Sequence, residues 1–293
     1  MAKRIFLFLI TNILVIVTIS FILSFLGVGN YIGRDGLDYQ ALLIFCLVWG
    51  MSGAFISLAL SRQMAKWMMG VKLVDSSMGG EAGWLVNTVH QMARRANLPA
   101  MPQVGIYDSP EVNAFATGPT KSRSLVAVSS GLLSTMSREQ VEGVLGHEVA
   151  HIQNGDMVTM TLLQGVINAF VMFLARVIAF AVSQNVKAEN RAMVNILVVM
   201  VLQIVLSILG ALVVCWFSRQ REFRADQGGA KLSSPSSMRS ALEGLRRLYT
   251  PAIEEEAKMH PSMAALKISG AKGGWMALFS THPPLEERIK RLS

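Results

Sequence analysis

Four long apolar runs, separated by polar and charged segments, dominate the pattern of the chain. They cover residues 5–26, 41–60, 160–182 and 193–217. A helix needs about 20 residues to cross the hydrocarbon core of a bilayer, so each run is long enough for a transmembrane segment. The first run is longer than the ~7–15 apolar residues of a signal peptide, and no small-residue cleavage site follows it. It therefore predicts an uncleaved anchor, and the four runs together predict two hairpins.

Basic residues flank the outer ends of both hairpins. They are Lys3, Arg4, Arg62 and Lys66 around the first, and Arg219, Arg221 and Arg224 after the second. By the positive-inside rule, these ends lie in the cytoplasm. The second hairpin is less clear, because its loop carries Lys187 and Arg191 and its first run contains Arg176. A charge in hydrocarbon is costly, so this hairpin either spans the bilayer or packs on protein.

The polar remainder predicts a water-exposed part made of helices and strands. The chain then has a transmembrane hairpin over 1–60, a polar segment over 61–159, a second hairpin over 160–217 and a polar segment over 218–293. Apolar residues at helical spacing predict a helix over 83–96, and β-like runs follow at 103–107 and 124–129 with a possible third strand at 113–118. Ser137 and Gln140 match a capping box, which predicts that a helix begins there.

Composition agrees with a membrane protein. Hydrophobic residues make up 52% of the 293 residues and charged residues 16%. The net charge of +8 fits an anionic membrane surface. It could also fit nucleic acid, but no nucleic-acid-binding motif accompanies it, so we expect no nucleic-acid partner. The two cysteines, Cys46 and Cys215, lie in apolar runs and exclude a disulfide framework.

The helix that Ser137 opens carries the clearest chemical motif, His147-Glu148-Val149-Ala150-His151. Residues four apart project from one helix face, so two imidazoles at this spacing can bind one zinc ion. Glu148 lies beside the pair and can act as a general base towards a zinc-activated water. The motif therefore predicts a metallopeptidase site.

A catalytic zinc usually has three protein ligands, and the third must come from elsewhere in the chain. An extended form of the motif needs glycine and histidine where this sequence has Asn154 and Met157. The best candidate is Glu222, and Asp226 one turn later could accept a hydrogen bond from a ligating imidazole. The alternative is that both acids merely balance the neighbouring arginines.

These motifs, taken in order, resemble the HtpX family of bacterial membrane zinc metalloproteases, which is related to the prenyl-protein (CAAX) endopeptidases. Two further segments carry the resemblance, Asn113-Ala114-Phe115-Ala116-Thr117-Gly118 and Thr281-His282-Pro283-Pro284-Leu285-Glu286-Glu287-Arg288-Ile289. The match covers essentially the whole chain. It implies a mainly α membrane protein whose α+β, thermolysin-like zincin domain is built from 61–159 and 218–293.

The family also implies roles for individual residues. His147, His151 and Glu222 would bind one Zn2+, with Glu148 as the base and Asp226 as a hydrogen-bond partner of a ligand. The other implied site residues are Asn113 and Ala114 on a substrate-binding edge strand, and His282 and Arg288 near the reacting groups. The segment His282-Pro283-Pro284 could equally be a rigid turn.

The resemblance further implies a multi-pass protein of the bacterial inner membrane, with its catalytic domain facing the cytoplasm. Its substrates would be unfolded or misfolded membrane proteins, cleaved in protein quality control and the stress response. The sequence makes no prediction of oligomeric state.

Two other classes fit less well. A noncatalytic membrane chaperone with structural zinc would typically use cysteine ligands, and both cysteines lie in apolar runs. A transporter needs polar residues distributed through its membrane segments, where this chain has Arg176 and a few uncharged polar residues.

Overall fold

The computed structural model describes residues 36–259 and 278–292, together with positions 17, 19–21, 24 and 32–33, and the side chains of 249–259 are not part of the description. The predicted first transmembrane run, 5–26, lies almost entirely outside the described residues. The chain divides into two compact units, one made of residues 1–57 and 160–214 and the other of residues 58–159 and 215–293.

Three helices of the described chain are long and apolar enough to cross a membrane. They are α2 (Tyr39–Met69), α6 (Asp156–Gln184) and α7 (Arg191–Leu232). Each contains one of the predicted runs 41–60, 160–182 and 193–217. A short 3-10 turn, Ala188–Asn190, precedes α7, and a two-stranded hairpin of β1 (Ile32–Gly33) and β2 (Gly36–Leu37) precedes α2.

Small residues allow the helices of the first unit to approach one another closely. A Cβ added to Gly50 of α2 would lie 2.5 Å from the backbone nitrogen of Ala169 in α6. A Cβ at Gly210 of α7 would lie 2.7 Å from the Ile167 side chain of α6. Such small-residue contacts are typical of helices packed in lipid, where the surrounding tails are as apolar as the helices themselves.

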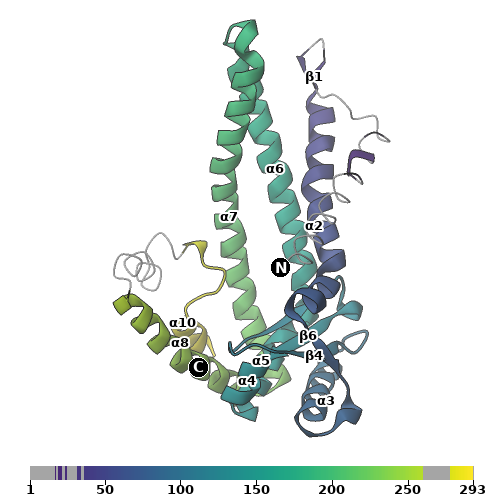
Figure 1. The fold of residues 1–293 in the computed structure, drawn as a ribbon, viewed down its shortest axis with the longest axis vertical. Coiled ribbons are helices and arrows are strands. Elements are labelled where there is room, and N and C mark those ends of the chain that lie inside the picture. The colour runs from purple at the N-terminus through teal and green to yellow at the C-terminus, as the bar shows by residue number, and fades with distance from the viewer. Residues whose placement is uncertain are drawn as a thin grey trace. The chain divides into compact units, whose positions relative to one another are not determined.

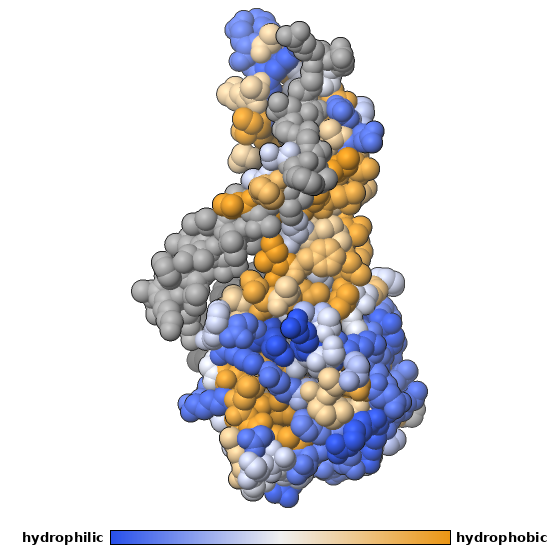
Figure 2. Space-filling view, turned by 90° about the vertical axis from the view of Figure 1, so that its right-hand side faces the viewer, coloured by the Kyte–Doolittle hydropathy of each residue, from blue (hydrophilic) through white to orange (hydrophobic). Residues whose placement is uncertain are grey.

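Hydrophobic side chains also gather on the face of this unit that Figure 2 shows. Only 6% of the most apolar 18-residue stretch of α7 is buried. The exposed side chains of this helix include Ile196, Val201, Ile204 and Leu209. Apolar surface this continuous is not stable in water. The unit is therefore built to lie in a bilayer.

The second unit contains a four-stranded sheet (Figure 1). Its strands are β3 (Lys72–Val74), β4 (Gln103–Tyr107), β5 (Ala114–Thr117) and β6 (Leu125–Ser129), in the order β3-β4-β6-β5. β4 and β6 are parallel, and the outer strands pair antiparallel to them. The three predicted strands are confirmed. β3 was not predicted, because three residues with an exposed leucine in the middle give no readable alternation.

Helices of the second unit pack on this sheet and on one another. They are α3 (Gly80–Arg95), α4 (Ser130–Thr135), α5 (Arg138–Asn154), α8 (Pro235–Met259) and α10 (Leu285–Arg291), with 3-10 turns at Ser76–Met78 and Lys121–Arg123. One buried core joins Leu85 and Val89 of α3, Val126 of β6, and Leu145 and Val149 of α5. Burying side chains of this size stabilises the fold by ~1.5–3 kcal/mol each.

Both ends of α5 are set by local sequence. The Ser137 side chain accepts a hydrogen bond from the Gln140 backbone, and the Gln140 side chain accepts one from the Ser137 backbone, so the predicted capping box is present. At the other end Gly155 adopts φ 72°, a left-handed conformation that favours glycine, and stops the helix. The next residue, Asp156, begins α6, so α5 runs into an apolar helix after a single turn residue.

Candidate metal and active site

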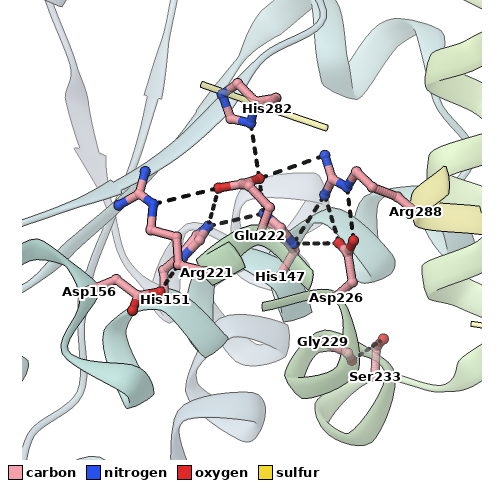
Figure 3. Close-up of polar contacts among 10 residues, drawn as sticks. All are labelled: His147, His151, Asp156, Arg221, Glu222, Asp226, Gly229, Ser233, His282 and Arg288. Atoms are coloured by element: carbon pink, nitrogen blue, oxygen red, sulfur yellow. Dashed lines mark hydrogen bonds and ion pairs between the residues drawn. The ribbon is translucent and has the colours of Figure 1, made fainter. Parts of the chain in front are cut away.

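Two histidines of α5 and one glutamate of α7 converge on a single point (Figure 3). The Nε2 atoms of His147 and His151 lie 3.1 Å apart. Glu222 faces both, with Oε2 3.4 Å from His147 Nε2 and Oε1 3.3 Å from His151 Nε2. All three residues are buried, so their polar atoms are aimed at one another rather than at solvent.

Close contact between α5 and α7 makes this convergence possible. A Cβ added to Gly229 of α7 would lie 2.8 Å from the backbone nitrogen of His147, and one added to Gly146 would lie 2.8 Å from the carbonyl oxygen of Gly229. A Cβ at Gly228 would similarly lie 2.7 Å from the Ala150 side chain. The two helices thus meet backbone to backbone, which brings the turns bearing Glu222 and Asp226 next to His147.

Each histidine is oriented by a carboxylate on its other ring nitrogen. Asp226 Oδ1 lies 2.9 Å from His147 Nδ1, and Asp156 Oδ2 lies 2.6 Å from His151 Nδ1. A proton held on Nδ1 by a carboxylate leaves Nε2 as the ligand atom, which is the usual arrangement around a metal-bound histidine. Asp226 was predicted as such a partner. Asp156 was not, although an acid directly after a helix-ending glycine can turn back towards the last histidine.

The same carboxylates shift the protonation of the metal-free histidines. Burial alone would lower the pKa of His151, but its bonds with Asp156 and Glu222 outweigh burial and raise the pKa to about 9. At His147 burial again lowers the pKa, and the bonds with Asp226 and Glu222 reverse this, so that the pKa lies above its usual range. Without a metal, protons therefore occupy this acidic pocket.

The three donors fit a metal ion of the size of zinc. Ligand atoms ~2.0–2.1 Å from a tetrahedral zinc lie roughly 3.3 Å from one another. The three distances of the site, 3.1, 3.4 and 3.3 Å, match this spacing. Within the described part of the chain, Glu222 Oε1 is also buried and makes no close hydrogen bond, with only His151 Nε2 at 3.3 Å and Arg221 Nε at 3.8 Å near it. A buried carboxylate oxygen in that state is costly unless a cation satisfies it.

Two residues of the C-terminal segment complete the surroundings. Arg288 of α10 is buried and donates from Nε and Nη2 to Asp226, at 2.8 and 2.6 Å. Burial would lower its pKa, but the Asp226 carboxylate raises it, so Arg288 stays charged. The Nδ1 atom of His282 lies 2.9 Å from Glu222 Oε2, while 62% of its side chain is exposed. His282 therefore lies between the buried donors and solvent.

A cavity of about 330 Å3 opens beside the three donors. Glu148 lines it together with His147, Glu222, His282 and Arg288. Asn113 and Ala114 line it from the start of β5, an edge strand of the sheet. The rest of the wall is aliphatic, formed by Val112, Leu132, Val144, Met238, Ala241, Leu242, Leu245 and Leu285 with Pro283. Seven of the nine predicted site residues thus line one cavity. The other two, His151 and Asp226, lie directly behind its wall.

Comparison with known proteins shows which family the chain belongs to. The model described as Peptidase family M48 matches residues 80–293, and the model described as RDD family matches residues 1–139. "Protease HtpX homolog" of Bacillus velezensis (strain DSM 23117 / BGSC 10A6 / LMG 26770 / FZB42) is 54% identical over 299 residues, which cover 100% of this chain and 99% of the relative. The chain belongs to the HtpX group of peptidase family M48.

Other relatives agree. "Protease HtpX homolog" of Bacillus subtilis (strain 168) is 54% identical, covering 100% of this chain and 99% of its own. "Protease HtpX" of Thioalkalivibrio sulfidiphilus (strain HL-EbGR7) is 49% identical, covering 99% of this chain and 98% of its own. The crystal structure of S. mikatae Ste24p superposes with a TM-score of 0.61 at 16% identity, covering 100% of this chain and 67% of that one. That likeness shows a shared fold.

The family and the site together define the class of this M48 peptidase. It is a metal-dependent peptidase, and His147, His151 and Glu222 form a group that could hold the metal. The three apolar helices of the described residues make it a membrane protein, and as a peptidase it acts on protein substrates.

Proposed function

We propose that this M48 peptidase is a zinc endopeptidase of the bacterial inner membrane that cleaves unfolded or misfolded membrane proteins. In this proposal His147, His151 and Glu222 bind the zinc, and Glu148 is the general base. The observation that carries it is the convergence of the three donors, at 3.1–3.4 Å, beside a cavity that Glu148 also lines. When bound, zinc would polarise the scissile carbonyl and lower the pKa of a coordinated water.

The protein side chains then supply orientation and proton transfer. Glu148 follows His147 on α5 and is only partly buried, so its carboxylate can take a proton from a water in the cavity. His282 can donate a hydrogen bond to a substrate oxygen, because its imidazole lies at the solvent side of Glu222. Arg288 is bound to Asp226 through two hydrogen bonds, which supports a role in holding Asp226 on His147.

The edge of the sheet suggests how substrate is bound. β5 pairs with β6 on one side, where the Asn113 backbone bonds to Ser129, and the backbone of Ala114 begins its other side at the cavity. An extended peptide can add to such an edge through backbone hydrogen bonds, which select an unfolded chain rather than a particular sequence. The aliphatic wall favours an apolar side chain next to the scissile bond, as membrane proteins expose when they misfold.

The orientation in the membrane is proposed from charge. Basic residues at Arg62, Lys66, Arg219 and Arg224 follow the apolar parts of α2 and α7. Positive residues are retained on the cytoplasmic side, so we propose that the catalytic segments face the cytoplasm. A role in protein quality control and the stress response follows from that location and from the substrate class.

The test is substitution of the base. Glu148→Gln removes the proton acceptor and leaves the metal ligands intact. Purified in detergent, this variant should retain the metal content of the parent protein and lose cleavage of an unfolded membrane protein by ~10²–10⁴-fold. Glu139→Gln, at an exposed position of the same helix, is the matched control and should cleave normally. Undiminished cleavage by Glu148→Gln would exclude Glu148 as the base and with it the proposed mechanism. No cleavage by the metal-loaded parent protein would instead favour a noncatalytic metal-binding protein.

A further inference from the structure

Four residues of α7 form one stripe along the helix: Cys215, Arg219, Glu222 and Asp226. Their spacing of four, three and four residues places them on one face. The last two belong to the candidate metal site. Cys215 lies near the end of the apolar run 193–217, and Arg219 lies just after it, where the sequence assigns Arg219 to a basic membrane flank.

The structure gives Arg219 a different set of partners. Its Nη1 donates to the carbonyl oxygens of Leu278 at 2.9 Å and Ser280 at 2.8 Å. Cys215 adds a contact from its Sγ to the carbonyl oxygen of Phe279 at 3.2 Å. Three consecutive carbonyls are therefore held by one helix face. A guanidinium suits this task because it offers several donors in a fixed plane and keeps its charge.

The segment held in this way leads directly to His282. Ser280 Oγ donates to the carbonyl oxygen of His282 at 2.6 Å, which continues the anchoring by one further step. Beyond His282, Pro283 and Pro284 restrict the backbone and lead into α10, whose Arg288 is fixed on Asp226. The backbone around His282 is thus anchored to α7 on both sides, by Arg219 before it and by Arg288 after it.

We propose that Arg219 is a positioning residue for His282. Its hydrogen bonds to residues 278 and 280 hold the segment that presents the imidazole to Glu222 and to a substrate oxygen. This inference rests on the proposed function, because it assumes that His282 acts in cleavage. Arg219 acts through these directed hydrogen bonds, in addition to supplying the positive charge of a membrane flank.

A double-mutant cycle tests the proposal. Arg219→Gln should reduce kcat/KM for an unfolded substrate by roughly ten- to a hundredfold, mainly through kcat, since the apolar cavity wall is untouched. His282→Ala should reduce it at least as much. In the double variant, loss of Arg219 should cost nothing further, because there is no imidazole left to position. Multiplicative losses, or a fully active Arg219→Gln or His282→Ala, would overturn the proposal.

Arg224→Gln is the matched control. Arg224 lies on the same helix and is exposed, with its guanidinium 6.0 Å from the Phe217 ring. It therefore has the charge of a membrane flank but lies away from the helix face that bears Arg219. It should retain activity. If Arg224→Gln and Arg219→Gln lose activity equally, the effect belongs to charge and the positioning role is excluded.

Hydrogen exchange separates this proposal from the proposed function itself. Arg219→Gln should increase the exchange rates of the backbone amides of residues 278–282, whereas Arg224→Gln should leave them unchanged. This readout needs no activity, so it holds even if the parent protein cleaves nothing. Unchanged exchange in Arg219→Gln would overturn the inference.

Discussion

Asp226 Oδ1 lies 2.9 Å from His147 Nδ1, although an entire apolar helix hairpin separates the two residues in the chain. The contact joins the helix of the two histidines to the helix of the third donor. It is supported from outside by Arg288, whose two hydrogen bonds fix both oxygens of Asp226. The orientation of His147 therefore depends on residues from two distant segments, Asp226 of α7 and Arg288 of α10.

Loss of the Asp226 charge should weaken metal binding. Asp226→Asn keeps the size of the side chain but removes the anionic acceptor of the His147 Nδ1 proton. Partners of this kind are typically worth ~10–100-fold in metal affinity or activity. Competition with a chelator in detergent measures the affinity, with Asp108→Asn as a control at an exposed position of the same unit. An unchanged affinity would show that Asp226 does not orient a ligand.

The same reasoning applies to Asp156 and His151. Asp156→Asn removes the acceptor 2.6 Å from His151 Nδ1 and should also lower metal affinity by ~10–100-fold. The double variant with Asp226→Asn should lose more than either single variant, because each aspartate serves a different histidine. Equal affinities for the parent and Asp156→Asn would exclude this role.

The glycine contact between α5 and α7 should be essential for the site. In Gly229→Ala the new Cβ would lie 2.8 Å from the His147 backbone nitrogen, so the helices must separate. We expect a destabilisation of ~1–3 kcal/mol and a reduced metal content. The thermal melting midpoint and metal analysis measure both effects. Gly53→Ala is the control, because a Cβ there meets nothing within 4 Å. Equal behaviour of the two variants would contradict the close approach.

Metal loading should release protons at neutral pH. The pKa of His151 is raised to about 9 in the metal-free protein, and that of His147 lies above its usual range. The stabilisation from the His151 proton is complete below the unfolded pKa of ~6.5 and is lost as the pH rises through about 9. A metal binds the neutral imidazoles, so its affinity should rise with pH up to that value. Calorimetry of zinc binding in buffers of different ionisation enthalpy measures the protons released. Zinc binding without proton release at pH 7 would contradict this arrangement.

Much of the fold follows from local sequence patterns. The capping box of Ser137 and Gln140 fixes the start of α5, and the β-like runs at 103–107 and 124–129 give two strands, because each of these signals is contained within a few residues. The long apolar runs likewise contain enough information to identify α2, α6 and α7. Helices α6 and α7 extend beyond the predicted runs, since polar residues at their ends continue the helix without an apolar signal.

Other features depend on contacts between distant segments. Gly146 and Gly229 look like ordinary helix-weakening residues until α5 and α7 are seen to meet at them. The partners of Arg219 are carbonyl groups, which every residue possesses, so no side-chain pattern identifies them. Asp156 reaches His151 only because Gly155 turns the chain. The sequence therefore predicts which residues carry the chemistry better than it predicts what holds them in place.

The central claim is that one zinc ion joins α5 to α7 through His147, His151 and Glu222. X-ray absorption at the zinc edge of the loaded protein tests it most directly, together with the zinc affinity of Glu222→Ala. We predict two imidazole nitrogens and carboxylate oxygen around the metal, no sulfur ligand, and an affinity in Glu222→Ala that falls by at least ~10-fold. A sulfur ligand, or a spectrum and affinity that Glu222→Ala leaves unchanged, would contradict the account.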